Sequence, residues 1–226
     1  MSRTVSGNLK GAKLSPRCPE VSPGCDRSAS VRDMSELLTI ERHDQVMVVH
    51  LDDGKANALS FAMIGGIMAA LAEAENDDEL GAVVLHGREG KFSAGFDLSV
   101  MMADNLSATI NLVADGGELV RTIFGCSVPV VAACTGHALA AGALILLGSD
   151  FRIGAADVPA KIGLNEVAIK MVLPDWALTI AHVRLSNRHK QRAIMNARVT
   201  GPADAVDVGF LDEVVPAGEL LDRAIT

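Results

Sequence analysis

Apolar segments of two kinds alternate along the chain from residue 46 onward, and this alternation is the strongest constraint on the fold. Strand-like runs rich in Val are separated by runs with helical spacing. In chain order the expected elements are a strand over 46–51, a helix from Ser60 to about Asn76, strands over 82–87 and 129–134, a helix over 141–147 and a strand over 150–154. Strands connected through helices pair in parallel. The pattern therefore predicts an α/β fold.

The composition fits one folded domain with a sizeable core. The chain has 226 residues, of which 49% are hydrophobic and only 3% are aromatic, with no Tyr. A chain of this length can form a single domain, and its core must be filled mainly by aliphatic side chains. We therefore expect tightly packed α/β layers.

Charge, apolar runs and cysteines exclude several classes of protein. The formal net charge is −8, without a cluster of Lys or Arg, which argues against a nucleic-acid partner. The richest apolar run, 138–147, is about half the length of a membrane span, so a soluble chain without a membrane segment is expected. The cysteines show no zinc-finger spacing, and no metal is expected; they are Cys18, Cys25, Cys126 and Cys134.

The composition also divides the chain. Residues 1–33 are rich in Ser, Pro, Gly and Arg, and we expect them to be a disordered extension, with Met34 as an alternative start. Residues 34–200 form the expected α/β core. Residues 201–226 contain a short helix, a strand-like segment and the beginning of another helix. We expect this last segment to be the start of an incomplete C-terminal helical region.

Two glycine-bearing turns follow apolar strands, in "FSAGFDL" (92–98) and "GHALAAGALILLGSD" (136–150). A turn between a strand and a helix leaves the first backbone N–H groups of the helix without partners. If the turns converge, the N–H groups of Phe96 and Ala141 can hold one carbonyl oxygen and stabilise the charge that it gains in an enolate. The small residues of the turns would let a substrate approach the backbone; they are Ala94, Gly95, Ala140, Ala141 and Gly142.

The order and spacing of several motifs resemble the crotonase superfamily, which comprises the enoyl-CoA hydratases and isomerases. The resemblance covers residues 36–226. It rests on "KANALS" (55–60), "FSAGFDL" (92–98), "PVVAACTGHALAAGALILLGSDFRIG" (129–154), "IGLNE" (162–166) and "GPADAVDVGFLDEVVP" (201–216). It implies a spiral of repeated β-β-α units followed by a C-terminal helical segment that is truncated here.

The resemblance also implies roles for individual residues. The amides of Phe96 and Ala141 would form an oxyanion hole for a thioester carbonyl, with alanine at a position where the family usually has glycine. The expected substrate and CoA contacts are Lys55, Ala56, Asn57, Ala94, Gly95, Asp97, Leu98, Gly142 and Leu144. No cofactor is implied, because CoA is part of the substrate. A homotrimer or hexamer is the expected assembly.

Hydratases of this family use two glutamates, at the positions of Leu144 and Glu166. Leucine at the first position should impair hydration, since water would lack one of its activating groups. One carboxylate is sufficient to move a proton from carbon 2 of a 3-enoyl-CoA to carbon 4. The resemblance is greatest to mitochondrial-type 3,2-enoyl-CoA isomerases, so Glu166 is the expected general base and acid. Asp97 and His137 are expected to be a cap and a structural residue.

Three functions stay open at this level. The first is an isomerase acting on unsaturated acyl-CoA. The second is a hydratase or another crotonase-type activity, in which Glu166 and an unidentified partner hold water. The third is a non-catalytic acyl-CoA-binding protein. The resemblance implies the cytoplasm for a bacterial protein and the mitochondrial matrix for a eukaryotic one, and the acyl length is open.

Overall fold

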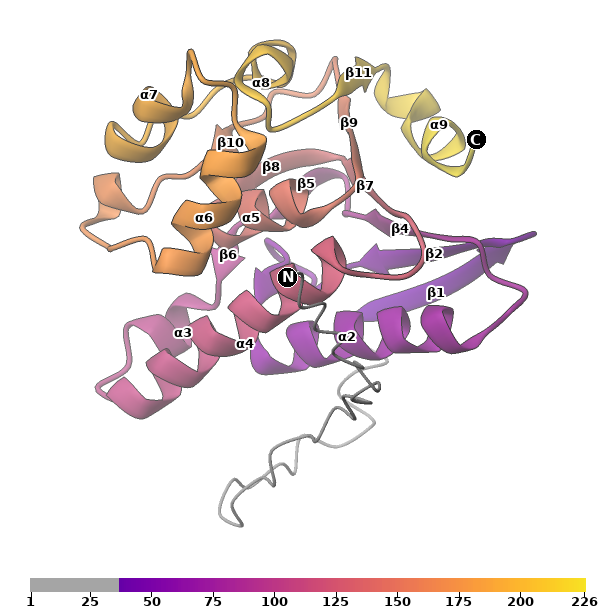
Figure 1. Ribbon diagram of the computed structural model, residues 1–226, viewed down its shortest axis with the longest axis horizontal. Helices are drawn as coiled ribbons and strands as arrows, with labels where there is room; N and C mark the ends of the chain where they lie inside the picture. The colour runs from indigo at the N-terminus through magenta and orange to yellow at the C-terminus, as the bar shows by residue number, and fades with distance from the viewer. Residues whose placement is uncertain (1–36) are drawn as a thin grey trace, which may run out of the picture.

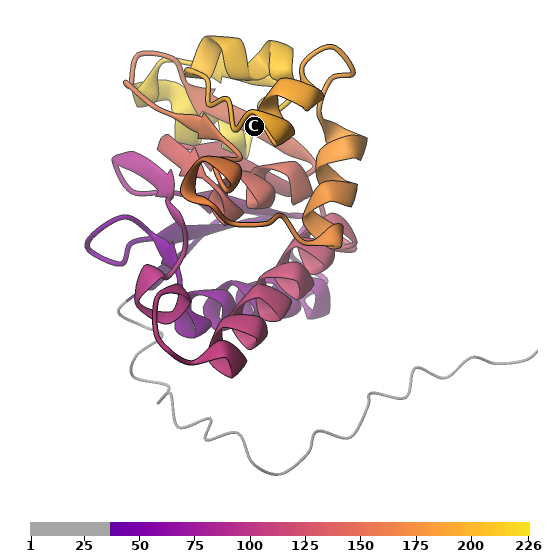
Figure 2. The same ribbon diagram turned by 90° about the vertical axis from the view of Figure 1, so that its left-hand side faces the viewer.

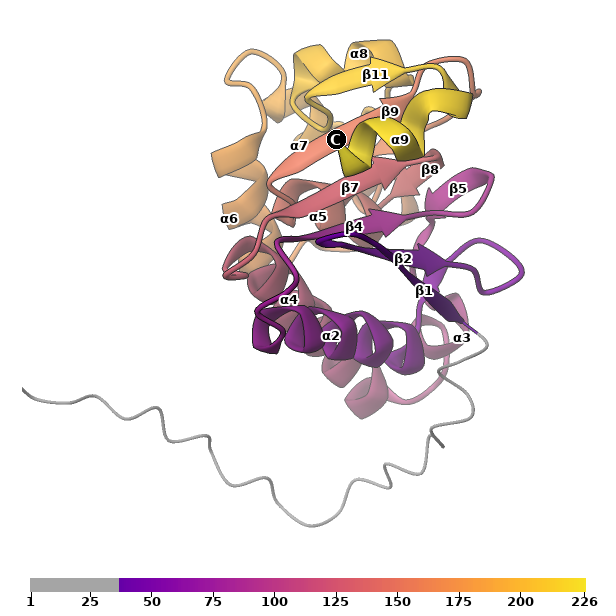
Figure 3. The same ribbon diagram turned by 90° about the vertical axis from the view of Figure 1, so that its right-hand side faces the viewer.

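The computed structural model describes residues 37–226 and shows one large sheet with helices on both faces (Figure 1). Six strands form this sheet in the order β1-β2-β4-β7-β9-β11, which can be followed in Figure 3. Their bounds are β1 Leu38–His43, β2 Val46–Leu51, β4 Ala82–His86, β7 Val130–Cys134, β9 Phe151–Ala155 and β11 Glu213–Val215. Only β1 is antiparallel to its neighbour. The predicted parallel α/β fold is confirmed.

Two smaller sheets lie beside the large one. One contains three parallel strands in the order β10-β8-β5, and the other pairs β3 with β6. Their bounds are β10 Ile162–Gly163, β8 Gly136–Leu139, β5 Gly90–Ser93, β3 Ala58–Leu59 and β6 Gly95–Phe96. The sequence predicted a turn where β6 lies and another where β8 lies, in the segments 92–98 and 136–150.

The helices follow the strands at regular intervals. Their bounds are α2 Phe61–Asn76, α3 Leu98–Met101, α4 Leu106–Phe124, α5 Ala141–Gly148, α6 Asp175–Arg184, α7 Lys190–Met195, α8 Pro202–Val208 and α9 Leu220–Ile225, with short 3₁₀ turns at Val167–Ile169 and Ala217–Glu219. The chain repeats one unit: a strand of the large sheet, a strand of a small sheet, then a helix. The units β2-β3-α2, β4-β5-α4, β7-β8-α5 and β9-β10-α6 form the expected β-β-α spiral.

Alternation along the strands divides the core between the two faces of the large sheet. On β2, Met47 and Val49 belong to the main cluster under α2, whereas Val48 belongs to a second cluster covered by Leu220 and Ala224 of α9. Successive side chains of a strand point to opposite faces, which explains this division. Figure 3 shows α2 and α9 on these opposite sides. Segment 201–226 therefore contributes to the packed core.

Local signals placed several elements correctly. Ser60 caps α2, because its side chain accepts a hydrogen bond from the Met63 N–H at 3.2 Å. The helix, strand and helix expected after Gly201 are α8, β11 and α9. Phe61, the first residue of α2, is 40% exposed. Among residues 37–226, no helix is both long and apolar enough to cross a bilayer. The predicted disorder of residues 1–33 lies outside the described residues.

Candidate active site

The small sheet β10-β8-β5 brings three chain turns to one edge. Its strands are parallel, with Ser93 opposite Ala138 and Gly163 opposite Leu139. The carboxyl ends of parallel strands lie at the same edge of a sheet. The segments that follow the three strands therefore emerge side by side. They are the segment from Ala94 to Phe96, the start of α5, and the segment that ends in Glu166.

The two predicted turns converge. A Cβ on Gly95 would lie 3.3 Å from the backbone N of Ala141 and 2.9 Å from the Cβ of Ala140. Gly95 also has a φ of +95°, which favours glycine. On the next position of α5, a Cβ on Gly142 would overlap the carbonyl oxygen of Ser93. Both glycines allow the start of α5 to approach the end of β5, so Gly142 has a packing role.

Ala141 presents a free backbone donor. It is the first residue of α5, and an N–H at this position has no intrahelical acceptor. The preceding residue, Ala140, has φ +49° and ψ −124° and offers no side-chain cap. An alanine rarely adopts this conformation. The sharp turn at Ala140 thus directs the chain from β8 into the helix.

The local structure at Phe96 differs from the prediction. It lies in β6, ahead of α3, so its N–H is not part of a helix N-terminus. The N–H of the next residue, Asp97, donates to the Leu59 carbonyl of β3 at 3.2 Å. Because successive N–H groups of a strand point to opposite sides, the Phe96 N–H points away from β3. Asp97 itself caps α3 by accepting from the Ser99 N–H at 2.8 Å, as expected of a cap residue.

Glu166 is a buried carboxylate three residues beyond β10. It is 7% exposed, and within residues 37–226 its Oε2 atom accepts no hydrogen bond. Burial raises its pKa to about 7, against a smaller lowering by its own backbone N–H. The backbone N–H of Ala140 donates to the Gly163 carbonyl at 3.1 Å, which ties the segment leading to Glu166 to the start of α5. A carboxyl group with this pKa can accept and return protons near neutral pH.

The loop at 53–57 is joined to the segment after β5. The Ala94 N–H donates to the Ala56 carbonyl at 3.0 Å, and the Ser93 hydroxyl donates to the Asn57 carbonyl at 2.7 Å. The buried side-chain amide of Asn57 donates to the backbone carbonyl of Leu51 at 2.8 Å. The structure thus brings together the two stretches expected to contact CoA. It uses the Asn57 side chain to hold the loop.

Two cationic residues near this loop were missed from the sequence. Arg88 Nη1 and Lys91 Nζ both donate to the Lys55 carbonyl, at 3.1 and 3.0 Å. Arg88 also forms an ion pair with Asp52 at 3.3 Å. Two cationic side chains therefore lie at the loop that contains Lys55, whose own side chain is exposed. The segments lie more than thirty residues apart, so only the pairing of the strands reveals this cluster.

The other predicted site residues have mixed surroundings. Leu144 is 1% exposed in α5, whose eight residues are all buried. Leu98 is 62% exposed on α3. Figure 2 shows the short helix α3 below the segment that joins β10 to α6. His137 is structural, as expected, since its Nδ1 accepts from the Lys161 N–H at 2.9 Å.

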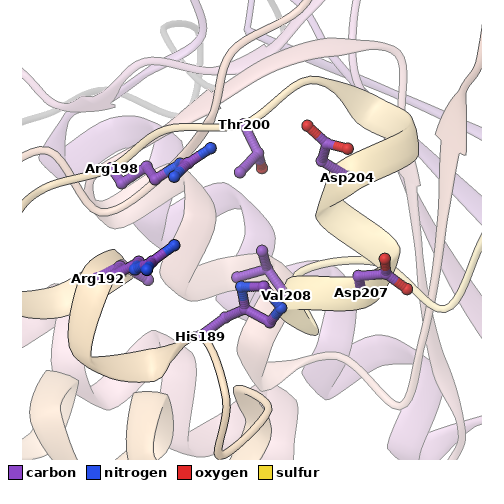
Figure 4. Close-up of a pocket in the computed structure, with 8 residues that line it drawn as sticks. His189, Arg192, Arg198, Thr200, Asp204, Asp207 and Val208 are labelled. Carbon is purple, nitrogen blue, oxygen red and sulfur yellow. The ribbon is translucent and has the colours of Figure 1, made fainter.

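Two cavities of the structure lie away from these residues. A pocket of about 140 Å³ is shown in Figure 4, where Arg192 and Arg198 face Asp204 across the space between α7 and α8. A second, of about 400 Å³, lies between α4 and α6 and is bordered by Phe124 and Trp176. Neither is lined by Glu166, Phe96 or Ala141.

Comparison with known proteins assigns the family. A model of the family described as enoyl-CoA hydratase/isomerase matches residues 41–226. Mitochondrial enoyl-CoA delta isomerase 1 of Mus musculus is 30% identical over 95% of this chain and 73% of its own length. A probable enoyl-CoA hydratase of Mycobacterium tuberculosis is 32% identical over 84% of this chain and 72% of its own length.

A solved structure agrees with this assignment. An enoyl-CoA hydratase/isomerase family protein from Pseudomonas syringae superposes with a TM-score of 0.81, at 41% identity, over 85% of this chain and 82% of that one. The chain belongs to the enoyl-CoA hydratase/isomerase family of enzymes, and its fold is the crotonase fold.

Proposed function

We propose that the protein is an enoyl-CoA isomerase that converts a 3-enoyl-CoA into the conjugated 2-enoyl-CoA. The observation that carries this proposal is that Glu166 is buried without a second buried acidic residue among residues 37–226. Its pKa is raised to about 7 by burial. One carboxylate with this basicity suits a reaction that moves a single proton between two carbons.

The proposed reaction uses Glu166 and the N–H groups of Phe96 and Ala141. Glu166 takes a proton from carbon 2, and the electron pair of the broken C–H bond moves toward the thioester carbonyl oxygen to give a dienolate. The backbone N–H groups of Phe96 and Ala141 donate hydrogen bonds to this oxygen where negative charge develops. Glu166 then gives its proton to carbon 4, and the double bond is left between carbons 2 and 3. Every proton and electron is returned to the product, so no cofactor is required.

A hydratase is the second candidate, because a relative of similar identity carries that name. Addition of water to carbon 3 needs a group that positions the water while another carboxyl group moves the proton. Leu144 stands where the resemblance places that second carboxylate, and it is buried in the apolar α5. A methyl-bearing side chain cannot hold or activate water. This difference favours isomerisation.

The cationic cluster of Lys55, Arg88 and Lys91 is the proposed contact for the phosphate groups of CoA. Arg88 and Lys91 both donate to the Lys55 backbone carbonyl, so these two side chains lie together at the loop that contains Lys55. Lysine and arginine bind phosphate through charge-assisted hydrogen bonds. The loop also adjoins Ala94, directly before the residues that would bind the thioester carbonyl. A homotrimer or hexamer in the bacterial cytoplasm or the mitochondrial matrix remains part of this proposal.

Product analysis tests the proposal. Purified protein and its Glu166→Gln variant would each be incubated with a 3-enoyl-CoA, and the products separated by mass and absorbance. We expect the wild type to form the conjugated 2-enoyl thioester with no added water, and the variant, which keeps the size of the side chain but not its basicity, to form none. A 3-hydroxyacyl product would instead support a hydratase, and tight binding without conversion would support a non-catalytic protein.

A further inference from the structure

Two adjacent glycines interrupt the middle of α4, and each faces an aromatic ring. A Cβ on Gly116 would overlap the ring of Phe96, and a Cβ on Gly117 would lie 2.9 Å from Nε1 of Trp176. Glycine is unfavourable inside a helix, because it loses more conformational freedom than other residues. Packing explains the two glycines of α4, because a larger residue at either position would clash with one of the two rings.

The ring of Phe96 belongs to the residue whose N–H faces the proposed oxyanion site. Strand β6 has two residues and pairs with a partner of two residues, β3. Two residues of pairing give little resistance to a shift of the strand. The ring of Phe96, however, lies in the space left by Gly116, where α4 contacts β6, and Gly116 itself is buried. The Phe96 side chain is thus held against the long helix α4, and it anchors the short strand β6 to this helix.

We propose that Gly116 is a positioning residue for the reaction: by admitting the Phe96 ring against α4, it fixes the Phe96 N–H at the angle required to donate to the substrate carbonyl. This inference rests on the proposed function, because it concerns the same carbonyl. Gly116 has no contact with the reacting atoms and acts only through Phe96. A methyl group at 116 would displace the ring and, with it, the short strand that carries the N–H.

The direct readout is the polarisation of a thioester carbonyl, which needs no turnover. Hexanoyl-CoA labelled with ¹³C at the carbonyl would be bound to the protein, and its C=O stretch measured by isotope-edited infrared spectroscopy. Two hydrogen bonds to the oxygen lower the frequency of this stretch. We expect a clear lowering in the wild type and most of it lost in Gly116→Ala. Turnover of a 3-enoyl-CoA should show kcat lowered roughly 10- to 100-fold with KM nearly unchanged.

Two further variants separate positioning from general damage. Gly65→Ala makes the same change inside α2, where a Cβ would meet nothing within 4 Å, and it should leave both the stretch and kcat unaltered. Phe96→Leu in the Gly116→Ala background shortens the ring side chain while keeping the amide, and it should restore part of the lowering. If Gly116→Ala does not fold, Phe96→Ala tests the same anchor from the other side and should weaken the carbonyl shift.

The outcomes distinguish this inference from the proposed function. A wild-type carbonyl shift that Gly116→Ala retains in full, with unchanged kcat, would overturn the inference alone. A wild-type shift without any isomerisation would contradict the proposed function and leave the positioning role in place. A wild type with no carbonyl shift would overturn both, because the two N–H groups would then bind no carbonyl.

Discussion

The backbone N–H of Ala140 donates to the carbonyl of Gly163 at 3.1 Å. This bond joins the end of β8 to the end of β10, so the first turn of α5 and the segment ending in Glu166 are held as one unit. The donor and the base of the proposed reaction come from different β-α units of the spiral. Pairing of the short strands, rather than proximity in sequence, sets their separation.

The activity of the wild type should rise with pH through the pKa of Glu166. The base must be ionised, and burial raises its pKa to about 7, so kcat/KM should be low in mild acid and reach half of its maximum near that value. The measurement is the pH profile of kcat/KM with a 3-enoyl-CoA. Glu166→Asp keeps a carboxylate and should keep a rising profile at a lower level. A profile that is flat through neutral pH would contradict the assignment of the base.

Removing this carboxylate should stabilise the protein, and more so at higher pH. A glutamate pKa raised on folding means that the folded state keeps a proton that the unfolded state has lost between about pH 4.5 and 7, so stability falls as pH rises through that range. For a shift of this size the cost above pH 7 is on the order of 3 kcal/mol. Urea unfolding of wild type and Glu166→Gln across this range measures it. Parallel curves for the two proteins would show that Glu166 is not buried as an ion.

Much of the fold was predictable because its long elements follow simple patterns. The strand β7 is a continuous apolar run, and α2 has a capping serine directly before it. The short strands β3, β6 and β10 have two residues each, and no periodicity exists over two residues. The helix α4 was not predicted either, because Gly116 and Gly117 oppose helix formation locally. In the structure it is capped by Asn105 and held by its buried face, which includes Leu112 and Leu119, while the two glycines admit the rings of Phe96 and Trp176.

The residues of the candidate site could be predicted from the sequence. The local structure and the hydrogen-bond partners of several of them could not. Convergence of the segments at Gly95 and Ala141 was expected, and the structure shows it. The prediction that Phe96 lies at a helix N-terminus was wrong, because Phe96 pairs with Leu59 of β3 before α3 begins. The buried use of the Asn57 amide and the donation of Arg88 to Lys55 depend on contacts between distant segments. Sequence spacing carries no signal for either.

Ala140→Gly should raise the stability of the protein. Ala140 has φ +49°, a conformation that is strained for alanine by about 1–3 kcal/mol, and the greater freedom of glycine in the unfolded chain offsets only part of the relief. We expect a net gain of about 1 kcal/mol, or about 2–4 °C in Tm for a chain of this size. Differential scanning calorimetry measures the change.

Ala143→Gly is the matched control, since the same atoms are removed three residues further along α5. That residue lies inside the helix and is fully buried, so the variant should lose about 1–2 kcal/mol. If Ala140→Gly destabilised the protein to the same degree, the strain at Ala140 would not be real.

Removing one partner of the ion pair of Arg152 and Asp212 should destabilise the protein strongly. Arg152 donates to Asp212 through Nε at 2.8 Å and Nη2 at 2.6 Å, and its Nη1 donates to the Gly209 carbonyl at 2.7 Å. The guanidinium is buried, so Asp212→Asn would leave its charge without a counterion and should cost about 3 kcal/mol. Chemical denaturation measures this loss.

An exposed ion pair provides the comparison. Arg121 Nε donates to Glu118 at 2.8 Å on the surface of α4, and Glu118→Gln should change stability by less than about 1 kcal/mol. Equal effects of Asp212→Asn and Glu118→Gln would mean that burial does not strengthen the Arg152 pair.

In the proposed reaction, one buried carboxylate moves one proton within the substrate. The most direct measurement uses a 3-enoyl-CoA deuterated at carbon 2, in ordinary water, with enzyme in excess so that each molecule reacts once. Glu166 is 7% exposed, which slows exchange of its proton with solvent. We predict that a measurable fraction of the 2-enoyl-CoA product carries deuterium at carbon 4. Product bearing only solvent hydrogen at carbon 4, or a 3-hydroxyacyl thioester in its place, would contradict the one-base account.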